Sequence, residues 1–339
     1  MINLALETLL LGFAGEGAFA APARAFFWGA EPHPLLRSWP EILGWQSHKG
    51  LADAWDRSGF ARCDVPSGLW PLVMQLPGKA RDEIHGGFAK AWDLVEPGGM
   101  LVAAMENGAG AARFEKDLAK VVGAVHSRQK HKCRVFGARK EIPSPAVMPE
   151  GWLDAGRRKP IPGTHFVTEA GVFSATKVDP GSQLLVESLP TNLRGKVADL
   201  GAGWGYLTDA LLRRCPAVKQ VDLFESDSRA LDCARQNLAA QEAVLNFHWH
   251  DVTTGIPGRY DIILMNPPFH TRQMKDVALG RAFLNAARDA LYPGGEIWLV
   301  ANRQLPYEGV LDACGLLWRQ VVRDPVFKVI HAVMPMEQP

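Results

Sequence analysis

The chain has 339 residues, which at roughly 150 residues per domain suggests two domains, each long enough to bury its own core. Hydrophobic residues make up 47% and charged residues 22%, and the 33 glycines and 24 prolines are close to average usage, which argues against disorder, collagen and coiled coil. Lys and Arg (37) nearly balance Asp and Glu (36), so the net charge of +1 creates no global field for a polyanion, and any nucleic-acid binding must come from local patches.

The cysteines and the N-terminal segment bear on the compartment of the protein. The five cysteines are scattered and form no Cys-x-x-Cys pair, so we expect a reducing, cytoplasmic environment and no metal site. The run from Leu9 to Leu11 could belong to a signal peptide, but the segment lacks a basic region and carries Glu7 and Glu16. Its apolar spacing favours an amphipathic opening helix. No apolar run approaches the roughly 18 residues that span a membrane, so we expect a soluble chain with no membrane partner.

The second half alternates between segments typical of strands and of helices. Apolar runs predict strands over 196–200, 220–224, 261–265 and 296–301, and helical spacing covers 228–240. This alternation predicts an α/β fold in which a mostly parallel, twisted sheet is flanked by helices. Five prolines between Glu141 and Pro162 indicate a connection between domains. We therefore predict a first domain over 1–142, a linker over 143–162 and a second domain over 163–339.

The first half repeats features of the second half. Residues 96–104 and 292–300 both contain Pro-Gly-Gly followed by a strand-like run, at an offset of 196 residues. Residues 73–78 and 264–269 form a second pair in the same order, at an offset of 191 residues. Chance similarity among Pro-Gly-Gly turns is one explanation. Two related α/β domains in tandem explain both pairs.

A glycine-rich turn follows the first strand of the second half. Asp199-Leu200-Gly201-Ala202-Gly203-Trp204-Gly205 places three glycines at alternate positions between a strand and a helical run. Such a turn lets a nucleoside approach the backbone closely. Glu225 lies 20 residues after Gly205, at the end of the next predicted strand, where a carboxylate can accept hydrogen bonds from both ribose hydroxyls. The pattern predicts a nucleoside site, for either a dinucleotide or S-adenosylmethionine.

Asn266-Pro267-Pro268-Phe269 follows the predicted strand 261–265, at the sheet edge where open α/β folds bind ligands. An amine conjugated to a purine ring or an amide is a poor nucleophile, because its lone pair is delocalised. The Asn266 side-chain oxygen and the Pro267 carbonyl can accept its two hydrogens, and Phe269 can stack on the base. The alternative is an ordinary turn that ends a strand. Asp251 ends the preceding apolar run, so four polar features follow successive strands, which favours the functional interpretation.

The second half resembles the bacterial ribosomal RNA guanine-N2 methyltransferases, most closely the small-subunit methyltransferase C family, with the large-subunit relative as second choice. The resemblance covers about 170 residues from Gly163 onward. It rests on the segments Gly171 to Ser174, Asp179 with Gly181 to Leu185, Asp199 to Gly205, Asn266 to His270, Ala301-Asn302 with Leu305 to Tyr307, and Phe327 to Val329. It implies two tandem Rossmann-like class I methyltransferase domains, of which only the second binds the cofactor S-adenosylmethionine.

The resemblance also implies roles for individual residues. It assigns the methionine and ribose side of the cofactor to Asp199, Gly201, Ala202, Gly203 and Gly205. It assigns the ribose hydroxyls to Glu225, the adenine amino group to Asp251, and the guanine to Asn266, Pro267, Pro268 and Phe269, with Asn266 also beside the cofactor. Phe173 would lie on a loop that closes over the substrate. Trp204 departs from the family pattern, in which a smaller or polar residue is common.

The first half lacks these features. The position of the amine clamp reads Gln75-Leu76-Pro77-Gly78, and no Gly-x-Gly-x-Gly follows an early strand, so we expect this domain to be catalytically silent and to help position RNA. The densest basic stretch consists of Arg128, Lys130, His131, Lys132, Arg134, Arg139 and Lys140. These side chains could contact phosphates, or they could simply form a solvated face, and both interpretations are equally reasonable. Arg157, Arg158 and Lys159 form a second basic group. His248 and His250 share one strand face without a third ligand nearby, which argues against a metal site.

We therefore expect a cytoplasmic methyltransferase that uses S-adenosylmethionine to modify the exocyclic N2 of a guanine in ribosomal RNA, 16S rather than 23S, and that acts as a monomer on the RNA or the small subunit. The target base must be unpaired or flipped outward. A protein-glutamine or DNA-adenine methyltransferase needs the same clamp, although Phe269 in place of a tyrosine favours guanine. A dehydrogenase would leave Asn266 to Phe269 without a role. A non-catalytic RNA-binding or ribosome-assembly protein with a vestigial site is the remaining alternative.

Overall fold

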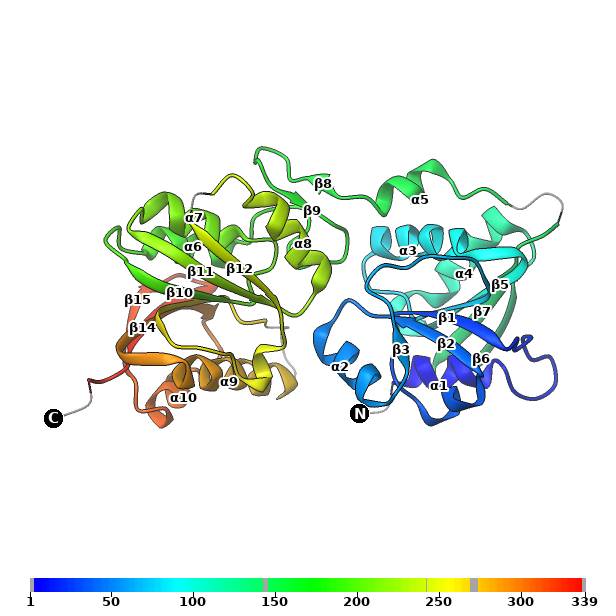
Figure 1. Ribbon diagram of the computed structural model, residues 1–339, viewed down its shortest axis with the longest axis horizontal. Helices are drawn as coiled ribbons and strands as arrows, with labels where there is room; N and C mark the ends of the chain where they lie inside the picture. Colours follow the sequence, from blue (N-terminus) through cyan, green and yellow to red (C-terminus); the bar gives the residue numbers. More distant parts are fainter. Residues whose placement is uncertain (1–2, 143–145, 242, 269–273, 337–339) are drawn as a thin grey trace. The chain divides into compact units, whose positions relative to one another are not determined.

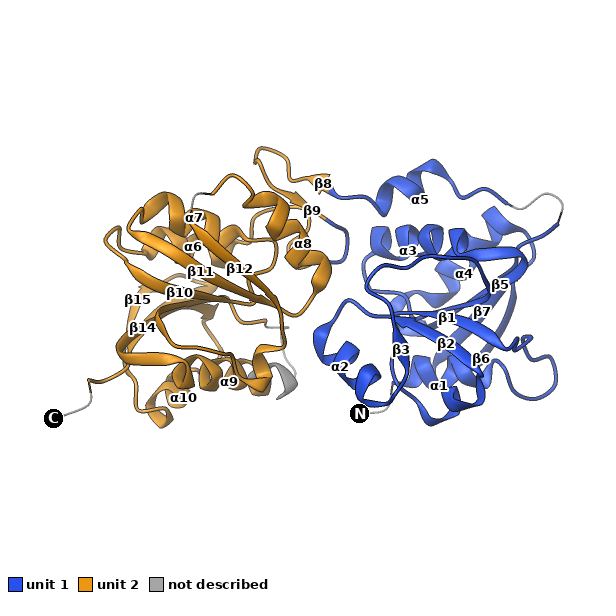
Figure 2. Cartoon of the chain, in the orientation of Figure 1, with its two compact units in different colours: residues 1–158, 169–171 blue, residues 159–168, 172–339 orange. Residues whose placement is uncertain are grey.

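The computed structural model describes residues 3–142, 146–241, 243–268 and 274–336. The chain divides into two compact units, one formed by residues 1–158 with 169–171 and the other by 159–168 with 172–339 (Figure 2). The break after residue 158 lies within the predicted linker segment, whereas residues 169–171, which belong to the first unit, lie beyond it. That segment also contains helix α5 (Glu150–Ala155), which contacts α3 (Arg81–Asp93) of the first unit. This contact depends on two glycines, because a Cβ added to Gly86 would lie 2.5 Å from the Cα of Gly156.

The first unit opens with the predicted helix, α1 (Leu4–Leu11), whose first turn is capped by the Asn3 side chain. Its strands are β1 (Arg24–Trp28), β2 (Glu41–Trp45), β3 (Ala61–Arg62), β4 (Trp70–Gln75), β5 (Val95–Glu106), β6 (His126–Lys130) and β7 (Cys133–Arg139). Its remaining helices are η1 (Pro34–Ser38), α2 (Lys49–Arg57), α3, η2 (Asn107–Ala109), α4 (Ala111–Val122) and α5.

The second unit carries a short two-stranded sheet, β8 (Lys159–Pro160) with β9 (Val167–Thr168), before its main sheet. The main strands are β10 (Gly195–Leu200), β11 (Val218–Glu225), β12 (Val244–Trp249), β13 (Tyr260–Met265), β14 (Leu291–Asn302), β15 (Leu317–Arg323) and β16 (Phe327–Val333). The helices are α6 (Pro180–Ser188), α7 (Tyr206–Arg214), α8 (Ser228–Asn237), η3 (Val252–Thr254), α9 (Met274–Asp289) and α10 (Glu308–Ala313).

The two large sheets have the same topology. Within the described parts of the chain, the strand order is β3-β2-β1-β4-β5-β7-β6 in the first unit and β12-β11-β10-β13-β14-β16-β15 in the second. In both, the strands run in the same direction except for the sixth in the order, β7 or β16, which is antiparallel to both of its neighbours. The prediction of tandem, mostly parallel α/β domains is confirmed, and the internal similarity reflects a repeated fold.

The core of the second unit lies on both faces of its sheet. Alternate residues of each strand point to opposite faces, so that Ile263 packs toward α9 and α10 while Ile262 and Leu264 pack toward α6, α7 and α8 (Figure 1). A parallel sheet covered on both faces requires strands that are apolar at nearly every position, which is why the predicted runs are continuous rather than alternating. The polar side chains after these strands are thereby left at the sheet edge.

Helix α8 begins at Ser228 as predicted but ends at Asn237, three residues before the predicted end. The Asn237 side chain donates to the carbonyls of Val167 (3.0 Å) and Trp204 (2.8 Å), so this residue serves tertiary contacts at the point where the helix stops. Among the helices of the described residues, none combines the length and the apolar character needed to cross a bilayer.

Candidate active site

The polar residues that follow β10, β11 and β13 lie at one edge of the sheet. Strand β10 is central, with Leu200 paired to Phe224 of β11 on one side and to Met265 of β13 on the other. Asp199, Glu225 and Asn266 each lie within one residue of these pairs, so the sheet register brings them to the same edge. Carboxyl ends of parallel strands form the ligand-binding edge in open α/β folds.

The glycine turn is held against β11 by its backbone. The N–H groups of Gly201 and Ala202 donate to the Phe224 carbonyl at 2.8 and 3.1 Å. Gly203 has a φ of 55°, and a Cβ added there would meet no described atom within 4 Å, so the turn borders open space. Gly205 takes a φ of 92° as the N-cap of α7, a left-handed conformation that favours glycine. The predicted strand, tight turn and helix are all present.

Asp199 is fully buried, and only one of its two carboxylate oxygens has a hydrogen-bond partner. Its Oδ2 accepts a hydrogen bond from the Thr208 hydroxyl at 2.7 Å, whereas its Oδ1 has no hydrogen-bond partner in the described structure. Burial, together with the nearby Glu225 carboxylate, raises the pKa of Asp199 to about 7. A buried carboxylate oxygen without a donor fits a site that receives a cationic or N–H donor from a ligand.

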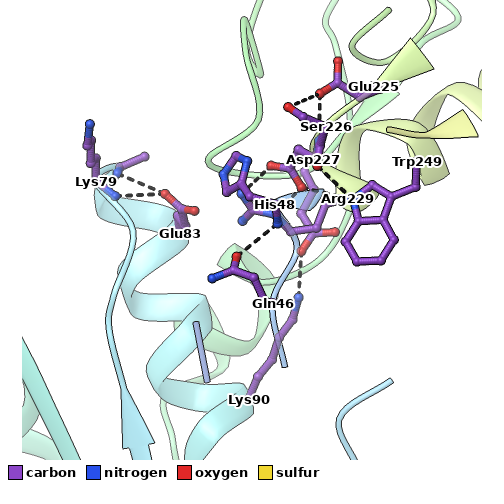
Figure 3. A network of polar contacts seen from close by, with 12 residues as sticks. Gln46, His48, Lys79, Glu83, Lys90, Glu225, Ser226, Asp227, Arg229 and Trp249 are labelled. Atoms are coloured by element: carbon purple, nitrogen blue, oxygen red, sulfur yellow. Dashed lines mark hydrogen bonds and ion pairs between the residues drawn. The ribbon is translucent and has the colours of Figure 1, made fainter. Parts of the chain in front are cut away.

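Glu225 organises the turn after β11 (Figure 3). Its Oε2 accepts from the Gly203 N–H at 2.8 Å, and its Oε1 accepts from the Asp227 N–H at 2.8 Å and from the Ser226 hydroxyl at 3.3 Å. Burial raises the pKa of Glu225. Because each carboxylate oxygen can accept two hydrogen bonds, Oε2 has capacity for a ligand hydroxyl.

Asn266 presents a defined face of its amide. Its Nδ2 donates to Asp179 Oδ2 at 2.9 Å and to Ser182 Oγ at 2.8 Å. Its Oδ1 is buried and has no hydrogen-bond partner among the described residues. The side chain therefore offers a single acceptor with no competing donor from the described residues, as the amine-clamp prediction requires.

A pocket lies between the glycine turn, Asn266 and the beginning of α6, and neither Asp199 nor Glu225 is among its lining residues. Of the residues predicted from the sequence, it is lined by Phe173, Gly201, Ala202, Gly203 and Asn266. The sequence reasoning assigned no role to the other lining residues, which are Ser174, Asp179, Ser182, Trp204, Tyr206 and Leu207. Asp179 and Ser182 could have been found from the helix start Asp-Pro-Gly-Ser, which predicts a capped N-terminus facing the sheet edge.

The contacts of Trp204 give a structural role to this residue, which departs from the family pattern. The indole is buried, and its Nε1 donates to the Phe173 carbonyl at 3.0 Å. Phe173 itself is 55% exposed, on the segment that borders the pocket. Trp204 thus fixes the backbone of the predicted closing segment while leaving the Phe173 ring free to contact a ligand.

The remaining predicted residues take different positions. Asp251 caps η3, where its Oδ1 accepts from the backbone N–H and the hydroxyl of Thr253, and it is not among the pocket-lining residues. Pro267 is buried and Pro268 is exposed directly after Asn266. Phe269 lies outside the described residues, so its predicted stacking role stays a prediction.

His248 on β12 and His250, directly after this strand, both contact groups of the protein itself. His248 stacks on Phe224 with ring centroids 4.5 Å apart, and the Nε2 of His250 lies 2.6 Å from the Gly255 carbonyl. The described residues contain no group of three or more His, Cys, Asp or Glu side chains able to hold a metal ion.

The turn after β2 of the first unit resembles the turn after β11, but it lacks the acidic side chain of Glu225. Gln46 occupies the position of Glu225, and its Oε1 accepts from the His48 N–H at 3.0 Å as Glu225 accepts from Asp227. The Gln46 amide, however, donates to the Ala30 carbonyl at 3.0 Å. After β4, the strand register places Leu76 at the position of Asn266, one residue later than the offset of 191 aligns, and Leu76 offers no side-chain acceptor. At the equivalent sheet edge of the first unit, an amide therefore replaces the Glu225 carboxylate, and an apolar side chain replaces the Asn266 amide.

A larger cavity of about 620 Å³ lies at the opposite end of the second sheet, where Arg194, Asp261 and Glu296 are at the beginnings of strands. It contains none of the predicted residues. The smaller pocket combines the glycine turn with the unsatisfied Asn266 Oδ1, and Asp199 lies two residues before Gly201 of that turn, so this pocket is the candidate active site.

Comparison with known proteins agrees with this geometry. Residues 163–331 match the Methyltransferase small domain family. Ribosomal RNA small subunit methyltransferase C of Salmonella newport is 28% identical over 277 residues, which cover 82% of this chain and 78% of the relative. The protein of that name from Salmonella paratyphi A is 29% identical over the same shares.

Among solved structures, a T. thermophilus 16S rRNA N2 methyltransferase in complex with AdoMet and guanosine has the same fold, with a TM-score of 0.79 and 24% identity. The similarity covers 98% of this chain and 92% of that chain, so it includes both units. Residues 163–331 of the chain therefore belong to the Methyltransferase small domain family, and the predicted resemblance to the ribosomal RNA small subunit methyltransferase C family is confirmed.

Proposed function

We propose that this protein is an S-adenosylmethionine-dependent methyltransferase that modifies the exocyclic N2 of a guanine in 16S ribosomal RNA. The observation that carries the proposal is the Asn266 amide, whose buried Oδ1 accepts no hydrogen bond from the described protein and lies beside the glycine turn in one pocket. The names of the curated relatives and of the structural neighbour support the same reaction and substrate.

The residues present fit the cofactor. Asp199 Oδ1 is a buried acceptor without a donor, which suits the ammonium of the methionine moiety. The Gly203 backbone borders open space, and Glu225 Oε2 retains acceptor capacity for a ribose hydroxyl. Asp251 remains our candidate for the adenine amino group, although its Oδ1 already accepts two hydrogen bonds from Thr253.

The protein's part in the reaction is to hold the amine. S-adenosylmethionine supplies a methyl group on a positively charged sulfur: the guanine nitrogen forms a bond to the methyl carbon while the carbon–sulfur bond breaks and its electron pair stays on sulfur. We propose that Asn266 Oδ1 and the Pro267 carbonyl accept the two N2 hydrogens and direct the lone pair out of the plane of the base. The amine becomes acidic as it is methylated, so its proton leaves to water without a strong base.

The test of the function is transfer of labelled methyl from S-adenosylmethionine to unmodified small subunits, large subunits and their naked RNAs, followed by nucleoside digestion. We expect N2-methylguanosine from the small subunit or its RNA. Labelled N2-methylguanosine from the large subunit would show that the target lies in 23S rather than 16S ribosomal RNA. Label found only in protein or DNA would show that the substrate is not a ribosomal RNA guanine. Absence of both cofactor binding and transfer would contradict the proposal and favour a non-catalytic RNA-binding role.

We propose that the first unit binds RNA in the cytoplasm, where ribosomal RNA is available, without catalysing the reaction. Part of its basic stretch serves the fold instead: Arg134 forms an ion pair with Glu115, and the Lys140 Nζ donates to the carbonyls of Trp92 and Val95. The residues at the turn between β6 and β7 are exposed, and they include Lys130, His131 and Lys132. These exposed residues are the ones suited to phosphate contact.

Replacing Lys130 and Lys132 together with alanine is expected to raise KM for the RNA several-fold while leaving kcat unchanged. Loss of two phosphate contacts should reduce the slope of log affinity against log salt by about 1.5 to 2. A matched control replaces Lys79 and Lys116, two exposed lysines elsewhere in this unit, so that net charge changes equally. Equal effects of the two double variants on KM and salt slope would contradict a specific role for the β6–β7 turn.

A further inference from the structure

The beginning of α6 holds the Asn266 side chain. Asp179 is the N-cap of this helix, and its Oδ2 accepts from the Ser182 N–H at 2.7 Å. The same oxygen accepts from Asn266 Nδ2 at 2.9 Å, and the Ser182 hydroxyl oxygen accepts from that Nδ2 at 2.8 Å. Both hydrogens of the Asn266 amide are therefore used within the protein.

These contacts determine which way the amide points. An ionised carboxylate only accepts hydrogen bonds, so the amide group that faces Asp179 must be the NH2. Turning the amide over would bring Asn266 Oδ1 against Asp179 Oδ2 and would direct the NH2 into the pocket. In that orientation the side chain could not accept a hydrogen from a substrate amine.

The bond to Asp179 also strengthens the acceptor. A hydrogen bond from an amide NH2 to a carboxylate polarises the amide and increases the negative charge on its oxygen. Asn266 Oδ1 is the atom that lacks a partner among the described residues. A more negative oxygen there stabilises the positive charge that develops on the attacked nitrogen during methyl transfer.

The local sequence builds this arrangement. Pro180 occupies the first turn of α6, where its missing N–H costs no hydrogen bond. A Cβ added to Gly181 would lie 3.1 Å from Asp179 Oδ2 and 3.1 Å from the Phe327 ring, so glycine allows the close approach. Ser182 is 7% exposed and Asp179 lines the pocket.

We propose that Asp179 and Ser182 are positioning residues that fix the Asn266 amide with its oxygen toward the substrate amine. This inference rests on the proposed function of Asn266 as the amine acceptor. It assigns the two residues a role in the rate of methyl transfer rather than in cofactor binding, because the contacts that carry the inference are those to the Asn266 amide.

The experiment compares Asp179→Ser, Asp179→Asn and Ser182→Ala with the wild type in methyl transfer to the RNA that the wild type modifies. Serine caps a helix as well as aspartate but is too short to reach Asn266, so we expect an unchanged Tm and a loss of about 10- to 100-fold in kcat. The asparagine carbonyl can accept both hydrogen bonds, so Asp179→Asn should recover most of that loss. Ser182→Ala removes one of the two acceptors and should cost less than Asp179→Ser.

Glu187→Gln is the control, because it removes a carboxylate from the same helix at a side chain whose partner is Gln183. Its kcat is expected to match the wild type. Wild-type kcat in both Asp179→Ser and Ser182→Ala would overturn the inference. If Asp179→Ser fails to fold, the rate of Ser182→Ala still tests the inference.

A second readout separates this inference from the proposed function. Exchange of the Asn266 side-chain amide hydrogens, followed by NMR on protein labelled at asparagine nitrogen, should be slow in the wild type and fast in Asp179→Ser combined with Ser182→Ala. Slow exchange in both proteins would overturn the positioning role. A wild type that shows protected hydrogens but transfers no methyl to guanine would contradict the proposed function and leave the orientation of the amide established.

Discussion

Asn266→Ala is expected to lower kcat for methyl transfer by about 10²- to 10³-fold, the range seen when one preorganised hydrogen-bonding group is removed from an active site. The substitution removes the acceptor that orients the amine lone pair and leaves the glycine turn and Glu225 intact. The Kd for S-adenosylmethionine, measured by titration calorimetry, should therefore change less than about threefold. Single-turnover transfer to the RNA, with protein in excess, measures the chemical step.

Asn246→Ala is a suitable control for this variant. Asn246 lies on β12 and donates to Asp222 at 2.6 Å, outside the pocket-lining residues. It should lose some stability without losing the rate of transfer. If Asn266→Ala retains the wild-type rate, the amine-clamp assignment is wrong, even if the protein is a methyltransferase.

The affinity for S-adenosylmethionine is expected to fall at acidic pH through Asp199. Burial raises the pKa of Asp199 to about 7, so the free protein carries a neutral carboxyl below that pH. An ammonium group of the cofactor is bound by the ionised form. Protonation should therefore weaken binding about tenfold between pH 8 and pH 6. Titration calorimetry at several pH values measures this slope.

Stability should depend on pH in the opposite sense. Because the folded pKa of Asp199 lies above the ordinary value of 3.8, the folded state binds the proton more tightly than the unfolded state. The stabilisation from this group is complete below about pH 4 and is lost as the pH rises toward 7. Without cofactor, the free energy of unfolding should therefore decrease over this window, as measured by denaturant titration.

Asp199→Asn tests both effects. The variant cannot ionise, so it should bind the cofactor weakly at every pH and lose most of the pH dependence of stability between 4 and 7. Glu225→Gln is the comparison variant: Asp199 can still titrate in it, but at a lower pH, because the carboxylate that helps to raise the pKa of Asp199 is gone. An unchanged pH slope of binding in Asp199→Asn would show that another group controls it.

The strand and turn pattern was readable from the sequence because it depends on short-range physical requirements. Continuous apolar runs predicted β10, β11, β13 and β14 within a few residues, except that β14 begins five residues earlier, at Leu291. The alternate glycines predicted the turn, because only glycine adopts the positive φ found at Gly201, Gly203 and Gly205 without strain. The same reasoning predicted that the first unit lacks the site, since its clamp position reads Gln75-Leu76-Pro77-Gly78 and no Gly-x-Gly-x-Gly follows an early strand.

The orientation of the Asn266 amide was decided only by the tertiary structure. The sequence shows that an asparagine follows a strand, but its oxygen faces the pocket because Asp179 and Ser182, more than 80 residues away along the chain, accept its hydrogens. The role of Trp204 likewise depends on the Phe173 carbonyl, 31 residues away. The sequence by itself determined the fold class, the repeat and the residue types at the sheet edge, because those follow from local periodicity and backbone geometry. Long-range packing decided which atoms remain unsatisfied, because that depends on every neighbour the folded chain brings to the site.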